Sequence, residues 1–167
     1  MDKRNWLQLI QPSKGRIVRP SKPRWVEEGT TLLSTLQRLA EGAETPSGLA
    51  AGLGELATLV ERSWEATRCF FLLYDEAAGE LVAPALLAGA DEAVDVPRLQ
   101  VEDTLVGTAL REGSTCFAWD EGDLSAPERE ILRRHRARHW LAVPLRAGEK
   151  MYGVMNLLLV EPVQLEG

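Results

Sequence analysis

Two apolar runs separated by a glycine-containing segment occupy the last third of the chain. They are Trp140–Leu145 and Met151–Val160, and Ala147-Gly148-Glu149 lies between them. β-Prone runs joined in this way are typical of an antiparallel hairpin. A chain of 167 residues can bury a sizeable core without disulfide bonds, since folding buries roughly 70% of the surface of a domain this size. We therefore expect one domain with a sheet at its centre.

A second pair of strands is expected near the middle of the chain. Cys69–Tyr74 is apolar on both faces, residues 75–79 have turn composition, and Leu81–Leu87 forms the next apolar run. Pro84 has no N–H for a ladder, so we expect it at a bulge or with its nitrogen facing away from the neighbouring strand. Residues 88–101 are expected to form a loop, with or without a short strand.

Capping signals locate the helices that follow. Thr104–Arg111 is expected to be a short helix closed by Gly113, and Thr115–Trp119 to be the next strand. Ser125-Ala-Pro-Glu128 has the pattern of a capping box, in which the serine and glutamate side chains each bond the other's backbone N–H. This pattern predicts a helix that begins at Ser125 and extends to His139.

Two amphipathic helices are expected ahead of these strands. Residues 25–43 and 45–64 carry apolar stripes with spacings of three and four, and Thr45-Pro46 suits the start of the second helix. The stripe positions expected to pack helices or to form a dimer are Leu32, Leu36, Leu39, Leu49, Leu53 and Leu56. The stripes are too short to indicate a coiled coil, so packing on the chain's own sheet and homodimerisation both remain open.

Charge is distributed unevenly along the chain. Residues 1–24 carry seven Lys or Arg against Asp2, which leaves −12 for the remainder of a chain whose net charge is −6. This segment contains three prolines, so we expect a basic extended arm, available to a protein partner, before one domain at 25–167 with helices at about 25–65 and a sheet core at about 67–160. The acidic body makes nucleic acid an unexpected partner, and without an apolar span we expect a cytoplasmic protein that does not bind membranes.

The order of these elements closely resembles the GAF family over about residues 30–160. The resemblance rests on Phe71-Leu-Leu-Tyr-Asp75, on Leu105-Val-Gly-Thr-Ala-Leu-Arg-Glu-Gly113, and on the hairpin Leu141-Ala-Val-Pro-Leu145 with Tyr152-Gly-Val-Met-Asn-Leu157. It implies an α+β fold, an α/β sandwich with a central antiparallel sheet, terminal helices on one face, and short helices, loops and a small-molecule pocket on the other. Members of the family bind cyclic nucleotides, tetrapyrroles or small metabolites, and some only dimerise.

The sequence departs from the better-marked branches of that family. It lacks the Asn-Lys…Phe…Asp-Glu signature of the cyclic-nucleotide branch, and Cys69 and Cys116 are each followed by Phe rather than by the His typical of bilin-binding relatives. Some GAF-like proteins reduce free methionine sulfoxide through cysteines. That activity would require both thiols to reach the pocket, whereas apolar neighbours raise the pKa of a thiol. We therefore expect no enzyme activity, with this reductase as an alternative.

The pocket implied by the resemblance would be lined by polar groups among apolar walls, and the candidates are Thr104, Thr108, Trp119, His135, His139 and Asn156. His135 and His139 lie four residues apart and would share a helix face. The residues between them are Arg-Ala-Arg, whose charge repels a cation, so we expect no metal and no cofactor. Non-covalent haem bound through His135 is the alternative.

These observations favour a non-enzymatic sensory or regulatory domain in signal transduction. A small ligand would shift the packing of the N-terminal helices and so control a dimer partner or an attached output module. The alternative is a pure interaction module that dimerises without a ligand, in which Phe71, Trp119, Trp140 and Met155 fill the cavity.

Overall fold

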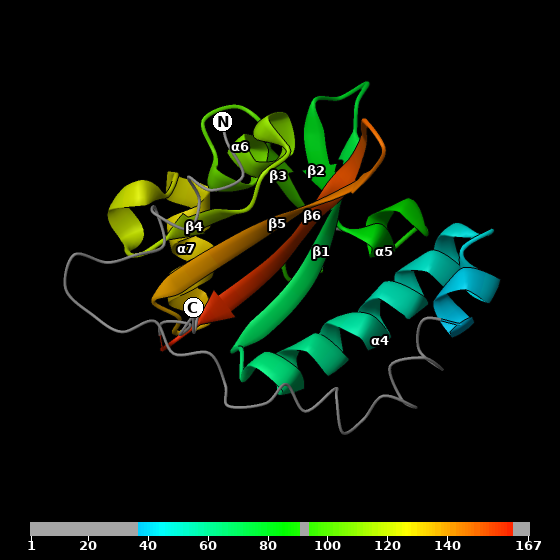
Figure 1. Cartoon of the computed structure of the whole chain (residues 1–167), viewed down its shortest axis with the longest axis horizontal. Helices are drawn as coiled ribbons and strands as arrows, with labels where there is room; N and C mark the ends of the chain where they lie inside the picture. Colours follow the sequence, from blue (N-terminus) through cyan, green and yellow to red (C-terminus); the bar gives the residue numbers. More distant parts are fainter. Residues whose placement is uncertain (1–36, 91–93, 162–167) are drawn as a thin grey trace.

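The computed structural model describes residues 37–90 and 94–161, which form an α+β fold around an antiparallel sheet. The strands are β1 (Arg68–Asp75), β2 (Glu80–Val82), β3 (Arg98–Gln100), β4 (Cys116–Ala118), β5 (His139–Ala147) and β6 (Lys150–Leu159), in the order β3-β2-β1-β6-β5-β4. The helices are α4 (Pro46–Trp64), α5 (Pro84–Leu87), α6 (Leu105–Glu112) and α7 (Ala126–Arg134), with a 3₁₀ helix at Glu121–Asp123. Figure 1 shows α4 below β1 and α6 above the sheet. The fold class expected from the sequence is confirmed.

The predicted C-terminal hairpin forms the centre of the sheet. β5 and β6 pair from His139↔Leu159 to Ala147↔Lys150. β6 also pairs with β1, along the register that joins Cys69 to Leu157. β6 therefore lies between β1 and β5 and joins the β3-β2-β1 strands to the β5-β4 strands.

Helix α4 begins where the Thr45-Pro46 signal predicted. The Thr45 side chain accepts a hydrogen bond from the Gly48 N–H at 3.0 Å, and proline occupies the first turn. The apolar stripe faces the sheet: Leu53 is buried, and Leu39, Leu49, Leu56, Val60 and Trp64 are partly buried against the same cluster. The described stripe residues therefore pack on the chain's own sheet, and dimerisation through these helices stays a prediction. Leu32, Leu36 and the basic arm 1–24 lie outside the described residues.

The prediction of a strand over Leu81–Leu87 is wrong beyond Val82. β2 contains only Glu80–Val82, and the residues from Pro84 form helix α5 instead of continuing the strand. Pro84 occupies the first turn of α5, where a missing N–H has no cost because the first helical amides have no partner within the helix. The predicted bulge is therefore replaced by a helix start, while the short strand allowed within 88–101 exists as β3.

The helix predicted over 125–139 ends earlier than expected. Ser125 and Glu128 form the complete capping box, but α7 stops at Arg134 and His135 is its C-cap residue. Arg136 has a φ of +53°, a left-handed conformation that reverses the chain direction, and His139 then begins β5. The two histidines therefore belong to different elements and do not share a helix face.

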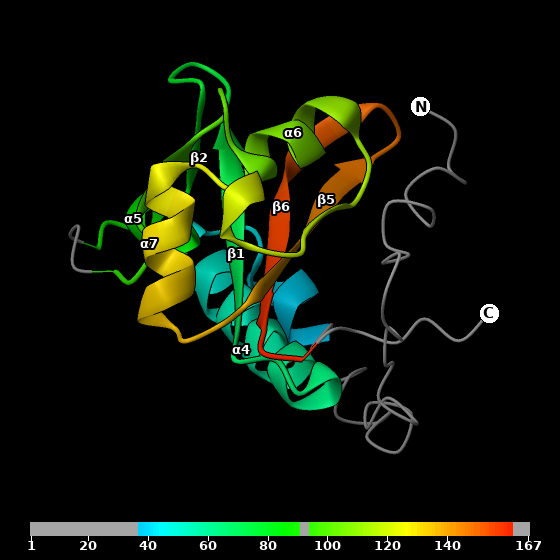
Figure 2. The same cartoon turned by 90° about the vertical axis from the view of Figure 1, so that its left-hand side faces the viewer.

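The core has one cluster on each face of the sheet. The larger cluster joins the sheet to α6 and α7 through residues such as Leu72, Val106, Leu132 and Trp140, and Figure 2 shows α6 and α7 beside the central strands. The smaller cluster lies between α4 and the sheet and contains Leu53, Ala57, Cys69, Phe71 and Leu157. In the described part of the chain, no helix combines the length and the hydrophobicity that crossing a membrane requires.

Candidate functional site

The two threonines among the predicted pocket residues stabilise the start of α6. The Thr104 hydroxyl donates to the Gln100 carbonyl at 2.6 Å and accepts from the Gly107 N–H at 3.0 Å, so that Thr104 is the N-cap of the helix. The Thr108 hydroxyl donates to the Thr104 carbonyl at 2.9 Å. Both hydroxyl protons are therefore used within the helix start.

Trp119 and His139 lie together at the β4–β5 side of the sheet. Their ring centroids are 5.9 Å apart, and each ring also contacts Phe117. The His139 Nδ1 atom is 2.8 Å from the Trp119 carbonyl oxygen. Burial lowers the pKa of His139, which the hydrogen bond to Trp119 only partly opposes. This aromatic cluster is half-buried.

Asn156 belongs to the core between the sheet and α6. Its side chain has no exposed surface; its Oδ1 accepts from the Trp140 Nε1–H at 2.9 Å, and its Nδ2 donates to the Phe70 and Val154 carbonyls at 3.4 and 3.3 Å. Trp140 is likewise fully buried and makes an edge contact with the Phe70 ring at 5.8 Å. Of the bulky residues considered as cavity fillers, Trp140 therefore fills this interior, while Phe71 and Met155 pack in the cluster under α4.

The His135 side chain contacts Asp95, in the segment before β3. Its Nε2 atom lies 2.7 Å from the Asp95 Oδ2 atom, in a close contact without hydrogen-bond geometry. Arg134 donates to the carbonyl and carboxylate oxygens of Asp95 at 2.8 and 3.2 Å. The six predicted residues thus make contacts with one another or with other parts of the chain, and none of them lines the cavity described next. A ligand role for them remains a prediction.

A cavity of about 190 Å³ lies on the other face of the sheet, between α4, β1, α5 and the segment before β3. Its walls come from Ala50, Leu53, Gly54, Ala57 and Thr58 of α4, from Arg68–Phe71 of β1, and from the segments Ala83–Ala85 and Val94–Val96. Figure 1 shows α5 beside both α4 and β1. Most of the lining is aliphatic or aromatic, with Arg68 and Asp95 as charged members.

The cavity exists because α4 presents small side chains at this point. Ala50, Gly54 and Ala57 recur at spacings of four and three, so they occupy one helix face beside the leucine stripe. A Cβ at Gly54 would meet no atom within 4 Å, which shows that the space beside the helix is open there. The sequence reasoning missed this site, although a run of small residues next to an apolar stripe was its visible signal.

The two cysteines lie on opposite faces of the sheet. Cys69 packs in the cluster under α4, and Cys116 packs against the cluster on the other face. In the strand order, β5 and β6 lie between β4 and β1. The distance between β4 and β1 is therefore three strand spacings, or about 14 Å. A disulfide requires Cα atoms within about 7 Å, so these thiols cannot join in this fold.

Both thiols are also held in the protonated form. Burial, and then the nearby Glu61 carboxylate, raise the pKa of Cys69 to about 12. Burial, and then Glu112, raise the pKa of Cys116 to about 11. The thiolate is the nucleophilic form of cysteine, and the protonated thiol is a poor nucleophile. Among residues 37–90 and 94–161, no three His, Cys, Asp or Glu side chains gather in a way that could hold a metal ion.

Known proteins resemble this chain in fold. No curated protein sequence matches it. The GAF domain of an Acinetobacter phosphoenolpyruvate-protein phosphotransferase superposes with a TM-score of 0.55 at 20% identity, covering 80% of each chain. The corresponding domain from Coxiella burnetii gives 0.55 at 15% identity, covering 80% of this chain and 82% of that one. A free methionine-R-sulfoxide reductase from Neisseria meningitidis, solved with its substrate, gives 0.53 at 18% identity, covering 79% and 74%.

These identities establish a shared fold and nothing about shared chemistry. The phosphotransferase domains and the reductase superpose equally well on this chain, so the fold alone does not separate a domain of a larger enzyme system from a reductase. A family model described as the GAF domain matches residues 49–164, which include every described strand. The chain belongs to the GAF family.

Proposed function

We propose that this chain is a non-enzymatic regulatory domain in which a small ligand binds in the cavity beside α4 and changes how that helix packs on the sheet. The observation that carries the proposal is the position of the cavity, because α4 forms one wall and β1 and α5 form the others. A ligand that contacts both walls has different affinity for different helix positions. Such a difference is what allows binding to shift a conformational equilibrium, typically by about 1–3 kcal/mol.

The size of the cavity limits the ligand to a small metabolite. A cavity of about 150 Å³ holds benzene, and the volume here is about 190 Å³. Sites for drug-sized ligands are roughly 300–1,000 Å³. The proposal therefore does not extend to a cyclic nucleotide or a tetrapyrrole in this cavity.

The state of the two cysteines supports a role without chemistry. A cysteine-dependent reductase requires a reactive thiolate and a resolving thiol, whereas Cys69 and Cys116 are protonated and face opposite sides of the sheet. The expected site of action is the cytoplasm, where buried free thiols persist.

Native mass spectrometry of the purified full chain tests the proposal. The expected spectrum contains a small added mass that disappears on denaturation. The added mass should also be absent from Ala57→Leu, which places a larger side chain against the cavity. Retention of the same mass by Ala57→Leu would locate the ligand elsewhere and contradict the proposal.

The second candidate function is an interaction module that dimerises without a ligand. It is favoured by the filled interior on the α6 face, where Trp140 and Asn156 have no exposed surface. The same spectrum separates the two, since a homodimer without added mass would support the interaction module. In either case we expect the basic residues 1–24, which lie outside the described part, to contact an acidic protein partner.

A further inference from the structure

Arg68 is a charged lining residue that donates one hydrogen bond to Glu61 and has a buried Nε atom without a hydrogen-bond partner among the described residues. It begins β1, and its side chain is 42% exposed, so the guanidinium lies at the open side of the cavity. Its Nη1 atom is 3.4 Å from a Glu61 carboxylate oxygen, and its Nε atom is 3.8 Å from the Asp95 carboxylate. The Nε atom is buried and has no hydrogen-bond partner among the described residues. A buried donor without a partner is unfavourable, and an acceptor supplied from outside would satisfy it.

The two carboxylates beside Arg68 have closer partners elsewhere. Glu61 accepts a hydrogen bond from the Cys69 backbone N–H at 2.7 Å. Asp95 is 2.7 Å from the His135 Nε2 atom and 3.2 Å from an Arg134 nitrogen. All three contacts are shorter than the contact that the same carboxylate makes with Arg68. Arg68 therefore keeps donors for another acceptor, and Arg134 offsets part of the negative charge of Asp95.

The rest of the lining suits an apolar group. Leu53, Ala57, Phe71, Ala83 and Val96 are all less than 10% exposed and surround the cavity with carbon atoms. The Thr58 hydroxyl donates to the Gly54 carbonyl at 3.1 Å, so its proton is not available to a ligand. The Arg68 guanidinium thus lies at the open side of the cavity, and the interior of the cavity is apolar.

We infer that the cavity beside α4 binds a small organic acid, whose carboxylate pairs with the Arg68 guanidinium and whose short apolar tail lies among Leu53, Ala57 and Phe71. A guanidinium presents two parallel N–H groups that match the two oxygens of a carboxylate. This inference rests on the proposed function, because it names the ligand class of the same cavity. A benzoate-sized acid matches the volume of about 190 Å³, given that benzene fills a smaller cavity.

Titration of the ¹⁵N-labelled full chain with benzoate and with benzamide tests the inference. The two probes have the same ring and differ in charge. We expect benzoate to shift the amide signals of residues that line the cavity, such as Ala57, Thr58 and Ala85. Benzamide and acetate should bind more weakly, because benzamide lacks the charge and acetate lacks the tail. Loss of a charged hydrogen bond corresponds to roughly a tenfold to hundredfold weaker affinity.

Arg68→Gln is the decisive variant, and Arg62→Gln is its matched control. Arg62 lies in the last turn of α4, is exposed, and does not line the cavity. We expect Arg68→Gln to weaken benzoate binding by roughly tenfold or more while leaving benzamide binding unchanged, and Arg62→Gln to change neither. The amide spectrum of each variant also reports whether it is folded.

The remaining outcomes distinguish this inference from the proposed function. Equal affinity for benzoate and benzamide, with shifts at the cavity, would overturn recognition by Arg68 but would retain the cavity as a ligand site. Benzoate shifts at the cavity that Arg68→Gln leaves unchanged would assign the anion to another group and also overturn the inference. If benzoate caused no shifts at the cavity, the inference would be wrong, and the mass spectrum described above would decide the proposed function by itself.

Discussion

The Glu128 side chain has no exposed surface, and both of its carboxylate oxygens accept hydrogen bonds. One oxygen accepts from the Val106 backbone N–H at 3.1 Å, and the other accepts from the Ser125 N–H and hydroxyl at 2.9 and 2.8 Å. A single carboxylate therefore satisfies the first turn of α6 and the cap of α7 together. A buried carboxylate is tolerated here because donors surround it.

Glu128→Ala should lower the free energy of unfolding by about 2–4 kcal/mol, because it removes a helix cap and leaves buried N–H groups without an acceptor. This loss corresponds to a decrease of roughly 5–15 °C in the melting temperature, which differential scanning calorimetry measures. Glu128→Gln is the matched control, since its amide keeps one acceptor oxygen. Equal melting temperatures for Glu128→Ala and the wild type would show that the Val106 contact has no role in stability.

The buried thiols give the chain a defined response to alkaline pH. With a pKa of about 12 instead of 9.0, Cys69 has roughly a thousandfold lower thiolate fraction at pH 8, so it should react very slowly with a disulfide reagent until urea unfolds the chain. As the pH rises above about 9, thiols of the unfolded state lose protons before those of the folded state. The free energy of unfolding should therefore fall between pH 9 and pH 11. Replacing both cysteines with Ala should remove this part of the pH dependence in urea titrations, and an unchanged profile would contradict it.

At the scale of the element, Gly52 and Gly54 lie two positions apart in α4 and face different surroundings. A Cβ at Gly52 would come within 2.5 Å of the Leu39 Cδ1 atom and 3.0 Å of its Cα, whereas a Cβ at Gly54 would meet nothing within 4 Å. The first glycine allows the preceding helical segment, residues 37–42, to approach α4 closely. The second has no such contact.

Gly54→Ala should raise the free energy of unfolding by about 0.5–1 kcal/mol, because alanine has the higher helix propensity and no neighbour to displace. Gly52→Ala should lower it, since the Leu39 backbone must move. Urea denaturation of the two variants measures this contrast, in which each serves as the control for the other. A lower midpoint for Gly54→Ala would mean that the helix at this position depends on more than propensity.

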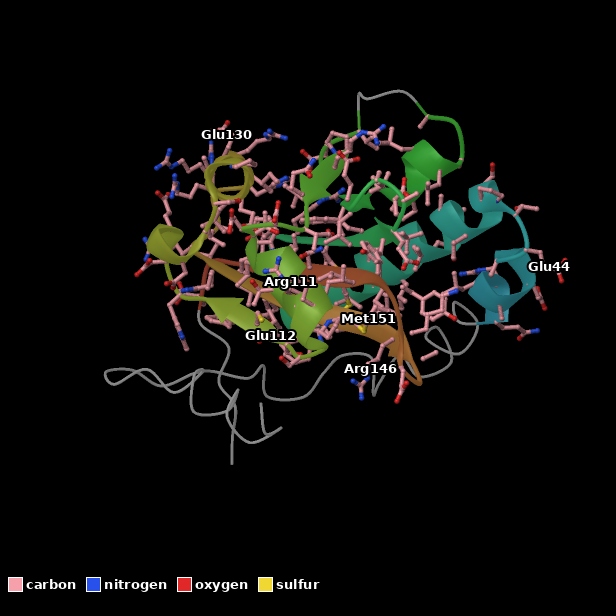
Figure 3. All side chains as sticks on the ribbon, turned by 90° about the horizontal axis from the view of Figure 1, so that it is seen from above. Glu44, Arg111, Glu112, Glu130, Arg146 and Met151 are labelled. Atoms are coloured by element: carbon pink, nitrogen blue, oxygen red, sulfur yellow. The ribbon has the colours of Figure 1, made fainter. Side chains whose placement is uncertain are left out.

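The elements whose ends depend on local hydrogen bonds were predictable from the sequence. Thr45-Pro46, Gly113 and the Ser125–Glu128 capping box all function as their residue types indicate. The end of α7 was not predictable, because the left-handed conformation falls on Arg136, a residue type with no preference for positive φ. The cavity escaped prediction for a different reason: the small residues of α4 indicate only one of its walls, and the sequence does not indicate how the other three segments meet that wall. Figure 3 shows Glu44 and Glu130 towards opposite ends of the described part of the molecule, with Arg111 and Glu112 of α6 between them.

At the scale of the whole molecule, the sheet consists of two halves that meet at β6. The β3-β2-β1 half and the β5-β4 half are joined through β6, which pairs with β1 on one side and β5 on the other. Both core clusters use this strand: Val154 and Leu158 belong to one, and Leu157 belongs to the other. Removal of β6 would therefore leave neither half with a complete core.

A chain that ends at Glu149 should not fold, whereas a chain that ends at Glu161, with every described strand intact, should unfold cooperatively. Far-ultraviolet circular dichroism and urea titration of the two truncated chains measure the difference. Native-like secondary structure with a sharp transition in the shorter chain would show that the β1 half is stable without β6.

The central place of β6 also determines when the protein can fold during its synthesis. The Asn156 side chain of β6 bonds the Phe70 carbonyl of β1 across 86 residues of sequence. At translation rates of about 5–20 residues per second, β1 is made roughly 4–17 s before its partner strand. During that interval the backbone edge of β1 that pairs with β6, from Arg68 to Leu73, has no partner strand. The nascent chain thus exposes an unpaired strand edge for seconds. This period is when it would most depend on a chaperone.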